Sequence, residues 1–147
     1  MNKHRSSFTI LMADDDRDDC LLVKEAFAES RLLNDLRFVA DGVELMDYLL
    51  HRGQYQDERS APRPGLILLD LNMPRKDGRE ALKEIKSHRD LRSIPVVILT
   101  TSKEEEDILQ SYDLGASSFI TKPVTFSGLM DAVQAMKKYW LEIVELP

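Results

Sequence analysis

The sequence has a single cysteine, Cys20, and no apolar run that could cross a membrane. One cysteine cannot form an internal disulfide, which favours a reducing compartment. A spanning helix needs about 18 consecutive apolar residues, and no apolar segment of a secretory signal follows the charged first residues. We therefore expect a cytoplasmic protein with no membrane partner, in which Cys20 serves as a small apolar residue of a helix.

Motifs of several enzyme and binding classes are also missing. No glycine-rich phosphate loop of the Walker type is present, so a bound nucleotide is not expected as a phosphate source. No cluster of histidine and cysteine offers a zinc site, and no Ser-His-Asp order is evident. The net charge of −6 argues against a surface that binds duplex nucleic acid, so we expect no nucleic-acid partner.

Apolar strand-like segments alternate with helical patterns along the whole chain. The composition, 43% apolar and 31% charged, is that of a globular protein, and its length suits one domain spanning residues 1–147. Strands are expected at 8–13, 35–40, 66–70, 95–100 and 117–121, each followed by a helix, with a long polar loop at 51–65. The central segments are apolar throughout, so they predict a doubly wound parallel α/β sheet covered on both faces.

Polar residues follow the apolar strands at their carboxyl ends. Such residues are Asp14 and Asp15 after the first strand, Asp70 after the third, Thr100 after the fourth and Lys122 after the fifth. In open parallel sheets the ligand crevice lies beyond the carboxyl ends of the strands. The sequence therefore predicts that these side chains share one site.

Three neighbouring carboxylates require either a proton or a cation. Two like charges about 4 Å apart at an effective dielectric near 20 repel by about 4 kcal/mol. Oxygen ligands with room for water suit Mg²⁺, and a hydroxyl and an ammonium opposite them suit a phosphoryl group. An aspartate placed between them can be a nucleophile toward phosphorus and form an acyl phosphate.

Each residue taken alone has a simpler explanation. Asp15 or Asp16 can be a helix N-cap, Thr100 a strand-end hydroxyl bonded to backbone, and Lys122 a solvated surface lysine. Asp70 differs because a carboxylate beside buried apolar residues needs a partner. The functional interpretation depends on all of these residues occurring together.

These segments resemble the receiver domain of two-component response regulators. The residues that carry the resemblance are Ile10-Leu11-Met12-Ala13-Asp14-Asp15-Asp16, Leu68-Leu69-Asp70-Leu71-Asn72-Met73-Pro74 with Asp77-Gly78, Pro95-Val96-Val97-Ile98-Leu99-Thr100, and Gly115-Ala116 through Lys122-Pro123. The resemblance covers essentially the whole chain. It implies a flavodoxin-like (βα)5 sheet with strand order 2-1-3-4-5.

The resemblance also implies roles for single residues. Asp70 would be the aspartate phosphorylated by a histidine kinase. Mg²⁺ or Mn²⁺ would be bound by Asp15, Asp70 and the backbone carbonyl of Asn72, with Asp14 acting through water. The chain would promote its own phosphorylation, and its dephosphorylation as a further option, without acting on a separate substrate.

A second set of implied roles concerns the phosphoryl group and the switch. Thr100 would hydrogen-bond the phosphoryl group, Lys122 would pair with it, and the bond before Pro123 would be cis. Phe119 would follow the Thr100 hydroxyl and remodel the surface of the fourth helix, fifth strand and fifth helix. Many receivers have tyrosine at this position, so Phe119 lacks the phenolic hydroxyl on which some receivers could depend. The alternative role for Phe119 is plain core packing.

The loop before the third strand and the C-terminal residues resemble the stand-alone receivers that partner bacterial phytochromes. We therefore expect a sensor histidine kinase of phytochrome type as phosphodonor, and no output domain. An apolar stripe at heptad-like spacing begins at Phe126, and its first half is expected to face the sheet. The stripe continues past residue 139, so Trp140, Ile143 and Leu146 are candidates for a homodimer contact. The alternative is that these residues fold back on their own domain.

Two other functions remain open at this stage. One is a phosphatase or phosphotransferase that forms an aspartyl phosphate on an α/β fold, although Asn72 stands where such enzymes usually have a second acid. The other is a scaffold receiver that acts without phosphorylation.

Overall fold

The computed structural model describes residues 9–30, 35–71, 73, 75–76, 78–100, 118–121 and 125–139, with backbone alone at 100, 118–121, 132 and 135–139. The strands are β1 (Thr9–Ala13), β2 (Asp35–Val39), β3 (Pro64–Asp70), β4 (Val96–Thr100) and β5 (Ser118–Thr121). The α-helices are α1 (Arg17–Glu29), α2 (Gly42–Leu49), α3 (Gly78–Ser87) and α5 (Phe126–Tyr139), and a short 3-10 helix, η1, spans Gly53–Tyr55. The helix expected after the fourth strand lies outside the described residues.

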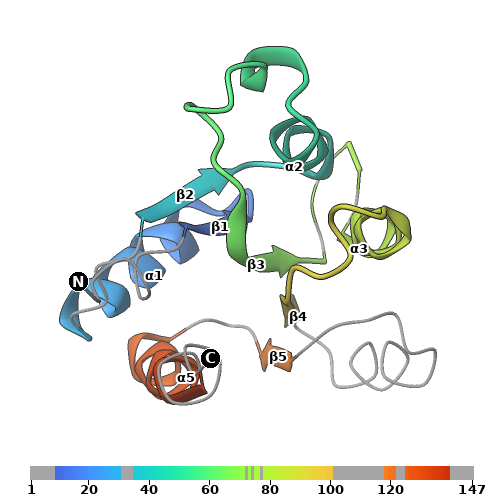
Figure 1. Cartoon of the computed structure of the whole chain (residues 1–147). Helices are drawn as coiled ribbons and strands as arrows, with labels where there is room; N and C mark the ends of the chain where they lie inside the picture. Colours follow the sequence, from blue (N-terminus) through green and yellow to red (C-terminus); the bar gives the residue numbers. More distant parts are fainter. Residues whose placement is uncertain are drawn as a thin grey trace.

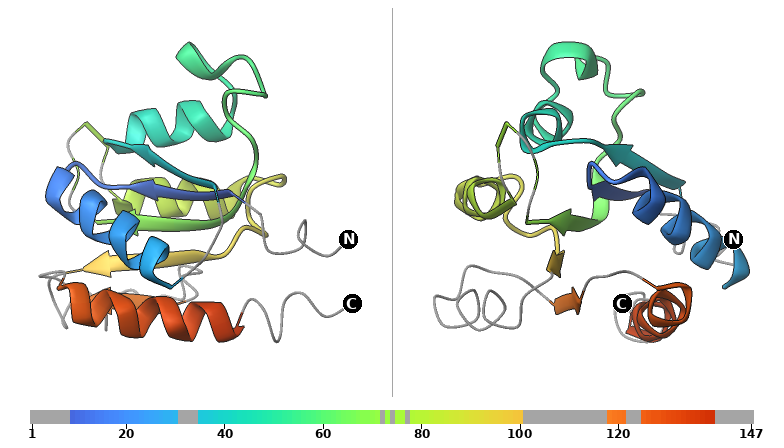
Figure 2. Two further views of the ribbon diagram at one scale, coloured as in Figure 1. Left: turned by 90° about the vertical axis from the view of Figure 1, so that its left-hand side faces the viewer. Right: turned by 180° about the vertical axis from the view of Figure 1, so that it is seen from behind.

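The five strands form one parallel sheet in the order β2-β1-β3-β4-β5. This confirms the predicted strand order. The described helices lie on both faces of the sheet, with α1 and α5 on one face and α2 and α3 on the other (Figures 1 and 2). The order reverses at β1, where the chain moves out to β2 and then returns to β3. A crevice for ligands is expected at that reversal.

Alternation along the central strands builds two cores. In β3, Leu66 and Leu68 pack on the α1 and α5 side, whereas Ile67 and Leu69 pack on the α2 and α3 side. Successive side chains of a strand point to opposite faces, so a continuous apolar run is needed when both faces are covered. All four leucine and isoleucine side chains are at most 1% exposed. The buried strand body therefore places Asp70 at a fixed point on the sheet edge.

Three local features differ from the sequence prediction. The 51–65 segment is more ordered than a polar loop, because it contains η1, and β3 begins at Pro64 rather than at residue 66. Proline is tolerated as the first residue of a strand, where its missing N–H breaks no internal ladder. Phe126, expected to face the sheet, is 38% exposed, while Leu129 and Val133 of the same helix are buried.

Candidate functional site

Three aspartates meet at the carboxyl ends of β1 and β3. Asp14 and Asp15 directly follow β1, and Asp70 is the last residue of β3, the neighbouring strand. Each carboxylate offers one oxygen, and these three oxygens lie within 4.8 Å of one another. Asp14 is 3% exposed and Asp70 2% exposed, whereas Asp15 is exposed to solvent. The predicted convergence of these three residues is confirmed.

The turn between β1 and α1 fixes the orientation of this acidic segment. The Asp14 backbone N–H donates to the Val39 carbonyl oxygen at 3.0 Å, and Asp14 Oδ1 accepts from the Asp16 N–H at 2.9 Å. Asp16 itself caps α1, since its Oδ1 accepts from the N–H groups of Asp18 at 2.9 Å and Asp19 at 3.4 Å. Capping is thus the structural role of Asp16, as an N-cap aspartate satisfies donors that the first helical turn leaves open. This decides the alternative that the sequence left open for Asp16.

Glycine at position 78 lets the chain return close behind Asp70. The Gly78 N–H donates to the Leu71 carbonyl oxygen at 2.9 Å, and this closes the connection between β3 and α3. A Cβ at Gly78 would overlap the Asp70 carbonyl oxygen and lie 2.7 Å from the Leu71 Cα. Both contacts are with backbone, so no side chain can move aside to accommodate one. Any larger residue at this position must displace the backbone that carries Asp70.

The donor set of the three aspartates fits a hard divalent cation. Carboxylate oxygens are the ligands that Mg²⁺ and Mn²⁺ prefer, and one exposed member leaves room for water on the ion. Two of the carboxylates are buried, where like charges repel more strongly than in water. A cation between the three oxygens would offset that repulsion. The residues present therefore fit the predicted metal.

A hollow of about 450 Å³ opens beside the acidic cluster, between α1 and the end of β2. Asp14 and Asp15 form part of its wall, together with Lys24 and Phe38. The cluster is thus reachable from solvent. Cys20 also lines this hollow, with its Sγ 3.8 Å from the Asp14 carbonyl oxygen, and it is half-buried in α1 as expected of a small helical residue.

The remaining predicted site residues are described less fully. Thr100 ends β4, the strand next to β3, and pairs in register with Thr121 of β5. Phe119 lies in β5 opposite Ile98. Both are described by backbone only, so their roles stay predictions. The other predicted residues, Asn72, Lys122, Pro123, Trp140, Ile143 and Leu146, lie outside the described residues.

An ion pair that no local sequence pattern predicts joins α2 to the segment after Asp70. Asp41 caps α2 by accepting from the Glu44 N–H at 2.8 Å, and its carboxylate also contacts the Arg75 guanidinium at 3.0 and 3.2 Å. The Asp41-Gly42 pair is a recognisable turn signal before a helix. Nothing in the local sequence, however, indicates that Arg75, which is 34 residues away, is its partner.

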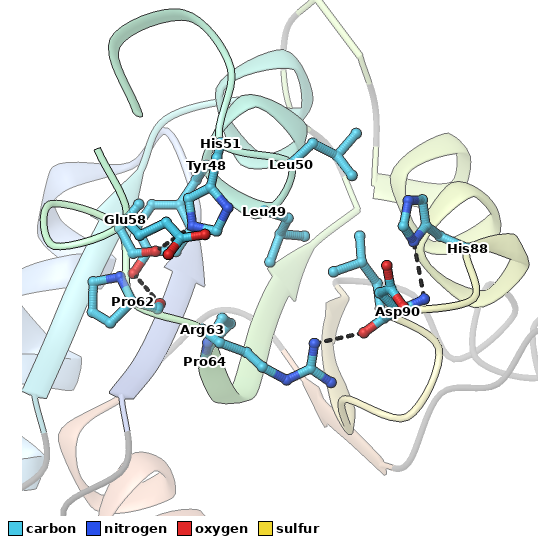
Figure 3. A pocket seen from close by; sticks show the side chains of 12 residues that line it. Tyr48, Leu49, Leu50, His51, Glu58, Pro62, Arg63, Pro64, His88 and Asp90 are labelled. Carbon is cyan, nitrogen blue, oxygen red and sulfur yellow. Dashed lines mark hydrogen bonds between the residues drawn. The ribbon is translucent and has the colours of Figure 1, made fainter. Parts of the chain in front are cut away.

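A larger hollow, of about 630 Å³, lies at the opposite end of the sheet (Figure 3). Residues from the end of α2, the 51–64 segment and the turn before β4 line it, among them His51, Arg63 and Asp90. Two of its polar side chains donate to backbone: the Tyr48 hydroxyl donates to the Pro62 carbonyl oxygen at 2.8 Å, and Arg63 Nη1 donates to the carbonyl oxygen of Asp90 at 2.5 Å. The acidic cluster belongs to the other edge of the sheet.

Comparison with known proteins agrees with the site and the fold. The family model of the response regulator receiver domain matches residues 10–134. The chain belongs to the response regulator receiver domains. Response regulator Rcp1 of Synechocystis sp. is 44% identical over 138 residues, which are 94% of this chain and 92% of Rcp1.

Two solved receiver structures are similar over nearly the whole chain. The phosphorylated cyanobacterial phytochrome response regulator RcpA is 45% identical with a TM-score of 0.80, covering 92% of this chain and 94% of RcpA. The Mn²⁺-bound form of Rcp1 is 44% identical with a TM-score of 0.80, covering 95% of this chain and 99% of Rcp1. Receivers bind Mg²⁺ or Mn²⁺ at an acidic site. In this chain Asp14, Asp15 and Asp70 form an acidic cluster.

Membership also narrows the class of activity. Receiver domains are generally signalling modules rather than enzymes, and their partner is a sensor kinase. None of the helices that the structure describes is both long enough and apolar enough to span a bilayer.

Proposed function

We propose that Asp70 accepts a phosphoryl group from a phosphohistidine of a sensor histidine kinase. The observation that carries this proposal is a 2%-exposed carboxylate at the end of β3 whose oxygen lies within 4.8 Å of two further carboxylate oxygens. A carboxylate oxygen of Asp70 attacks phosphorus, the P–N bond of the phosphohistidine breaks, and the imidazole leaves with its electron pair and its proton. The product is an acyl phosphate on Asp70.

The residues of the cluster have different roles in binding a divalent cation. Asp15 and Asp70 bind a divalent cation directly, the Asn72 backbone carbonyl is a third ligand, and Asp14 acts through water. Such an ion supplies positive charge that offsets the oxygens of the transferred group in a loose transition state. Burial at Asp14 and Asp70 excludes bulk water from one side of the site, which strengthens these interactions.

The neighbouring strands supply the proposed readout. Thr100 hydrogen-bonds the phosphoryl group and Lys122 forms an ion pair with it. The peptide bond between Lys122 and Pro123 is cis, and the Phe119 ring follows the Thr100 hydroxyl. β4 lies beside β3 and β5 lies beside β4, which supports this arrangement. The result is a change in the surface formed by the helix expected after β4, by β5 and by α5, through which one single-domain receiver spanning residues 1–147 signals to protein partners.

The proposed phosphodonor is a kinase of phytochrome type. Similarity to RcpA and Rcp1 over most of both chains supports this choice. We further propose that the chain binds no nucleic acid and forms a homodimer through Trp140, Ile143 and Leu146. The cytoplasmic location predicted from the sequence stays a prediction.

The only reactions proposed are those at the chain's own Asp70. The chain promotes its own phosphorylation and its own dephosphorylation, and acts on no separate substrate. A phosphatase of the aspartyl-phosphate type usually has a second acid two residues after the nucleophile, where this chain has Asn72.

Intact mass after incubation with Mg²⁺ and acetyl phosphate tests the proposal. The parent gains one phosphoryl group, Asp70→Asn gains none, and a metal chelator prevents the gain. Asp57→Asn, the same change at an exposed aspartate of the 51–64 segment, is the matched control and behaves as the parent. A parent that gains no mass, or a gain that survives Asp70→Asn, refutes the proposal.

The choice of kinase has its own test. A phytochrome-type kinase carrying a phosphohistidine is mixed with the chain beside a kinase of another sensory class. We expect faster transfer from the phytochrome type. Equal rates from both kinases would remove the phytochrome part and leave the phosphoacceptor role intact.

A further inference from the structure

The connection between β3 and α3 directly follows Asp70 and passes beside the start of α2 (Figure 1). Its described members are Leu71, Met73, Arg75 and Lys76. β3 fixes Asp70 itself, and the connection sets the course of the backbone immediately after it. Whatever holds this connection therefore acts on the site.

Two contacts from α2 hold the middle of the connection. The Gly42 N–H donates to the Lys76 carbonyl oxygen at 3.1 Å. The Arg75 guanidinium meets both oxygens of Asp41, with Nε 3.0 Å from Oδ2 and Nη2 3.2 Å from Oδ1. A two-pronged contact of arginine with a carboxylate fixes direction as well as distance. We call the contacts of Asp41 and Gly42 with Arg75 and Lys76 the α2 latch.

Backbone geometry indicates that the connection does not adopt this shape by itself. Arg75 has φ +67°, a left-handed conformation that L residues other than glycine rarely adopt. Such conformations persist where the surrounding contacts determine them, and they gather at binding sites. The Asp41 side chain is only 14% exposed, so this end of the ion pair is sheltered from water.

Close approach at Gly42 is part of the same arrangement. A Cβ at this position would overlap the Lys76 carbonyl oxygen and lie 2.7 Å from the Lys76 Cβ. The N-terminus of α2 and the connection are therefore in direct backbone contact. On its other side the connection is tied to α3, because Lys76 Nζ lies 2.9 Å from Glu84 Oε2.

We propose that Asp41 and Arg75 are positioning residues that set the affinity of the Asp14, Asp15 and Asp70 cluster for a divalent cation. This rests on the proposed function. The latch keeps the backbone after Asp70 in the arrangement that the cation needs. A chain without the latch occupies that arrangement less often, and the apparent affinity falls by the same fraction.

Single-residue variants can separate this role from a plain effect of charge. Asp41→Asn keeps an oxygen that caps α2 but loses the ion pair. Arg75→Gln also loses the ion pair, but it removes a positive charge. A field effect alone would make Arg75→Gln bind a divalent cation more tightly and Asp41→Asn less tightly. The latch predicts weaker binding in both.

The experiment is titration of the unphosphorylated full chain with Mn²⁺, followed by electron paramagnetic resonance of the free ion. We expect the dissociation constant to rise about fivefold in each variant, the upper end for an ion pair at a protein surface. The double variant Asp41→Asn/Arg75→Gln restores the net charge, and we expect the same fivefold rise because both changes break one contact. Asp57→Asn and Arg59→Gln, at an exposed pair 3.4 Å apart, are the matched controls and keep the parent value.

A second readout distinguishes positioning from loss of structure. Phosphorylation by acetyl phosphate is measured over a range of Mg²⁺ concentrations. The Mg²⁺ concentration at half-maximal rate rises in the latch variants, while the rate at saturating Mg²⁺ stays within about twofold of the parent, because saturation restores the occupied arrangement. Arg75→Lys, which keeps the charge with one contact instead of two, lies between parent and Arg75→Gln.

The outcomes separate the two proposals. Tighter Mn²⁺ binding by Arg75→Gln, or a double variant equal to the parent, overturns the latch and leaves Asp70 as phosphoacceptor. An unchanged Mn²⁺ affinity in both single variants does the same. A parent that binds no Mn²⁺ and accepts no phosphoryl group contradicts the proposed function itself.

Discussion

At the carboxyl end of the sheet three carboxylates face one another and two of them are buried, whereas at the amino end the Tyr48 hydroxyl and the His51 ring donate to backbone carbonyls. Asp14, Asp15 and Asp70 bring three oxygens within 4.8 Å. At the other end, the Tyr48 hydroxyl and His51 Nε2 each donate to a carbonyl oxygen of the 61–62 segment at 2.8 Å. The amino end has the larger hollow, about 630 Å³ against about 450 Å³.

The same strand joins these two ends, so the contrast is not one of fold. β3 starts at Pro64, which lines the amino-end hollow, and finishes at Asp70. A hydrogen bond to a carbonyl satisfies a buried donor and makes the structure more rigid. Gathered like charges destabilise the structure until a cation or a proton joins them. The contrast indicates that size of a hollow is a poorer guide to chemistry here than the kind of group it buries.

The largest effect that tests this contrast is stabilisation by metal. Mg²⁺ at about 100 times its dissociation constant raises the free energy of unfolding by about 2.7 kcal/mol, because only the folded chain brings the three carboxylates together. Urea unfolding with and without Mg²⁺ measures it. Asp15→Asn loses most of this gain, whereas Glu58→Gln at the amino-end hollow keeps it. Equal gains in the two variants would mean that the ion does not bind at the carboxyl end.

The next effect is that of a methyl group behind Asp70. Gly78→Ala lowers the free energy of unfolding by about 2 kcal/mol, since the added Cβ overlaps backbone at Asp70 and Leu71. It also slows phosphorylation by acetyl phosphate, because the backbone that carries Asp70 is displaced. Urea unfolding and intact mass measure the two effects.

Gly128→Ala in α5 is the control for that substitution. Its Cβ would meet a side-chain atom, Thr125 Oγ1, at 2.9 Å, and alanine favours a helix, so the free energy of unfolding changes by less than about 1 kcal/mol. A Gly78→Ala chain as stable and as reactive as Gly128→Ala would show that close approach behind Asp70 is not needed.

The smallest effect belongs to the amino end. Tyr48→Phe removes the hydrogen bond to the Pro62 carbonyl oxygen and lowers the free energy of unfolding by about 1 kcal/mol at neutral pH. Phosphorylation of Asp70 stays at the parent rate, as this hydroxyl lies at the opposite end of the sheet. A slower phosphorylation would show that the amino end of the sheet affects the chemistry at the carboxyl end.

The same hydroxyl gives a pH dependence of known sign. Burial raises the pKa of Tyr48 to about 12 from an ordinary value of 10.0. Its contribution to stability is therefore fully present below pH 10 and is lost as the pH rises toward 12, because the unfolded chain releases the proton first. Urea unfolding from pH 9 to 12 should show the gap between parent and Tyr48→Phe narrowing with pH. Burial also raises the pKa of Tyr55, so part of the alkaline loss remains in the variant.

The acidic cluster was predictable because the geometry of parallel strands is general. An apolar run that ends in aspartate places the carboxylate at the sheet edge, and strand order brings Asp14 and Asp15 next to Asp70. The N-cap could not be assigned in advance, because the sequence allowed either Asp15 or Asp16 in that role. The Asp18 and Asp19 N–H groups decide between them.

Local sequence patterns do not predict contacts between segments that are distant along the chain. Nothing near Arg75 indicates that it is held in a left-handed conformation against Asp41, because both the partner and the φ angle depend on how the second helix packs. The 51–65 segment was expected to be a plain polar loop, because its contacts are also with distant parts of the chain. Its order comes from bonds to α2 and to the turn before β4, such as those of Tyr48 with Pro62 and of Arg63 with Asp90.

The central claim is that the carboxyl end of the sheet carries the chemistry through one residue, and chemical trapping tests it most directly. The chain is phosphorylated with acetyl phosphate and Mg²⁺ and then treated with borohydride, which reduces an acyl phosphate to the alcohol. Peptide mass spectrometry then locates the homoserine that results. The account predicts homoserine at position 70 and at no other aspartate; homoserine at another position, or none in a chain that gained a phosphoryl group, would contradict it.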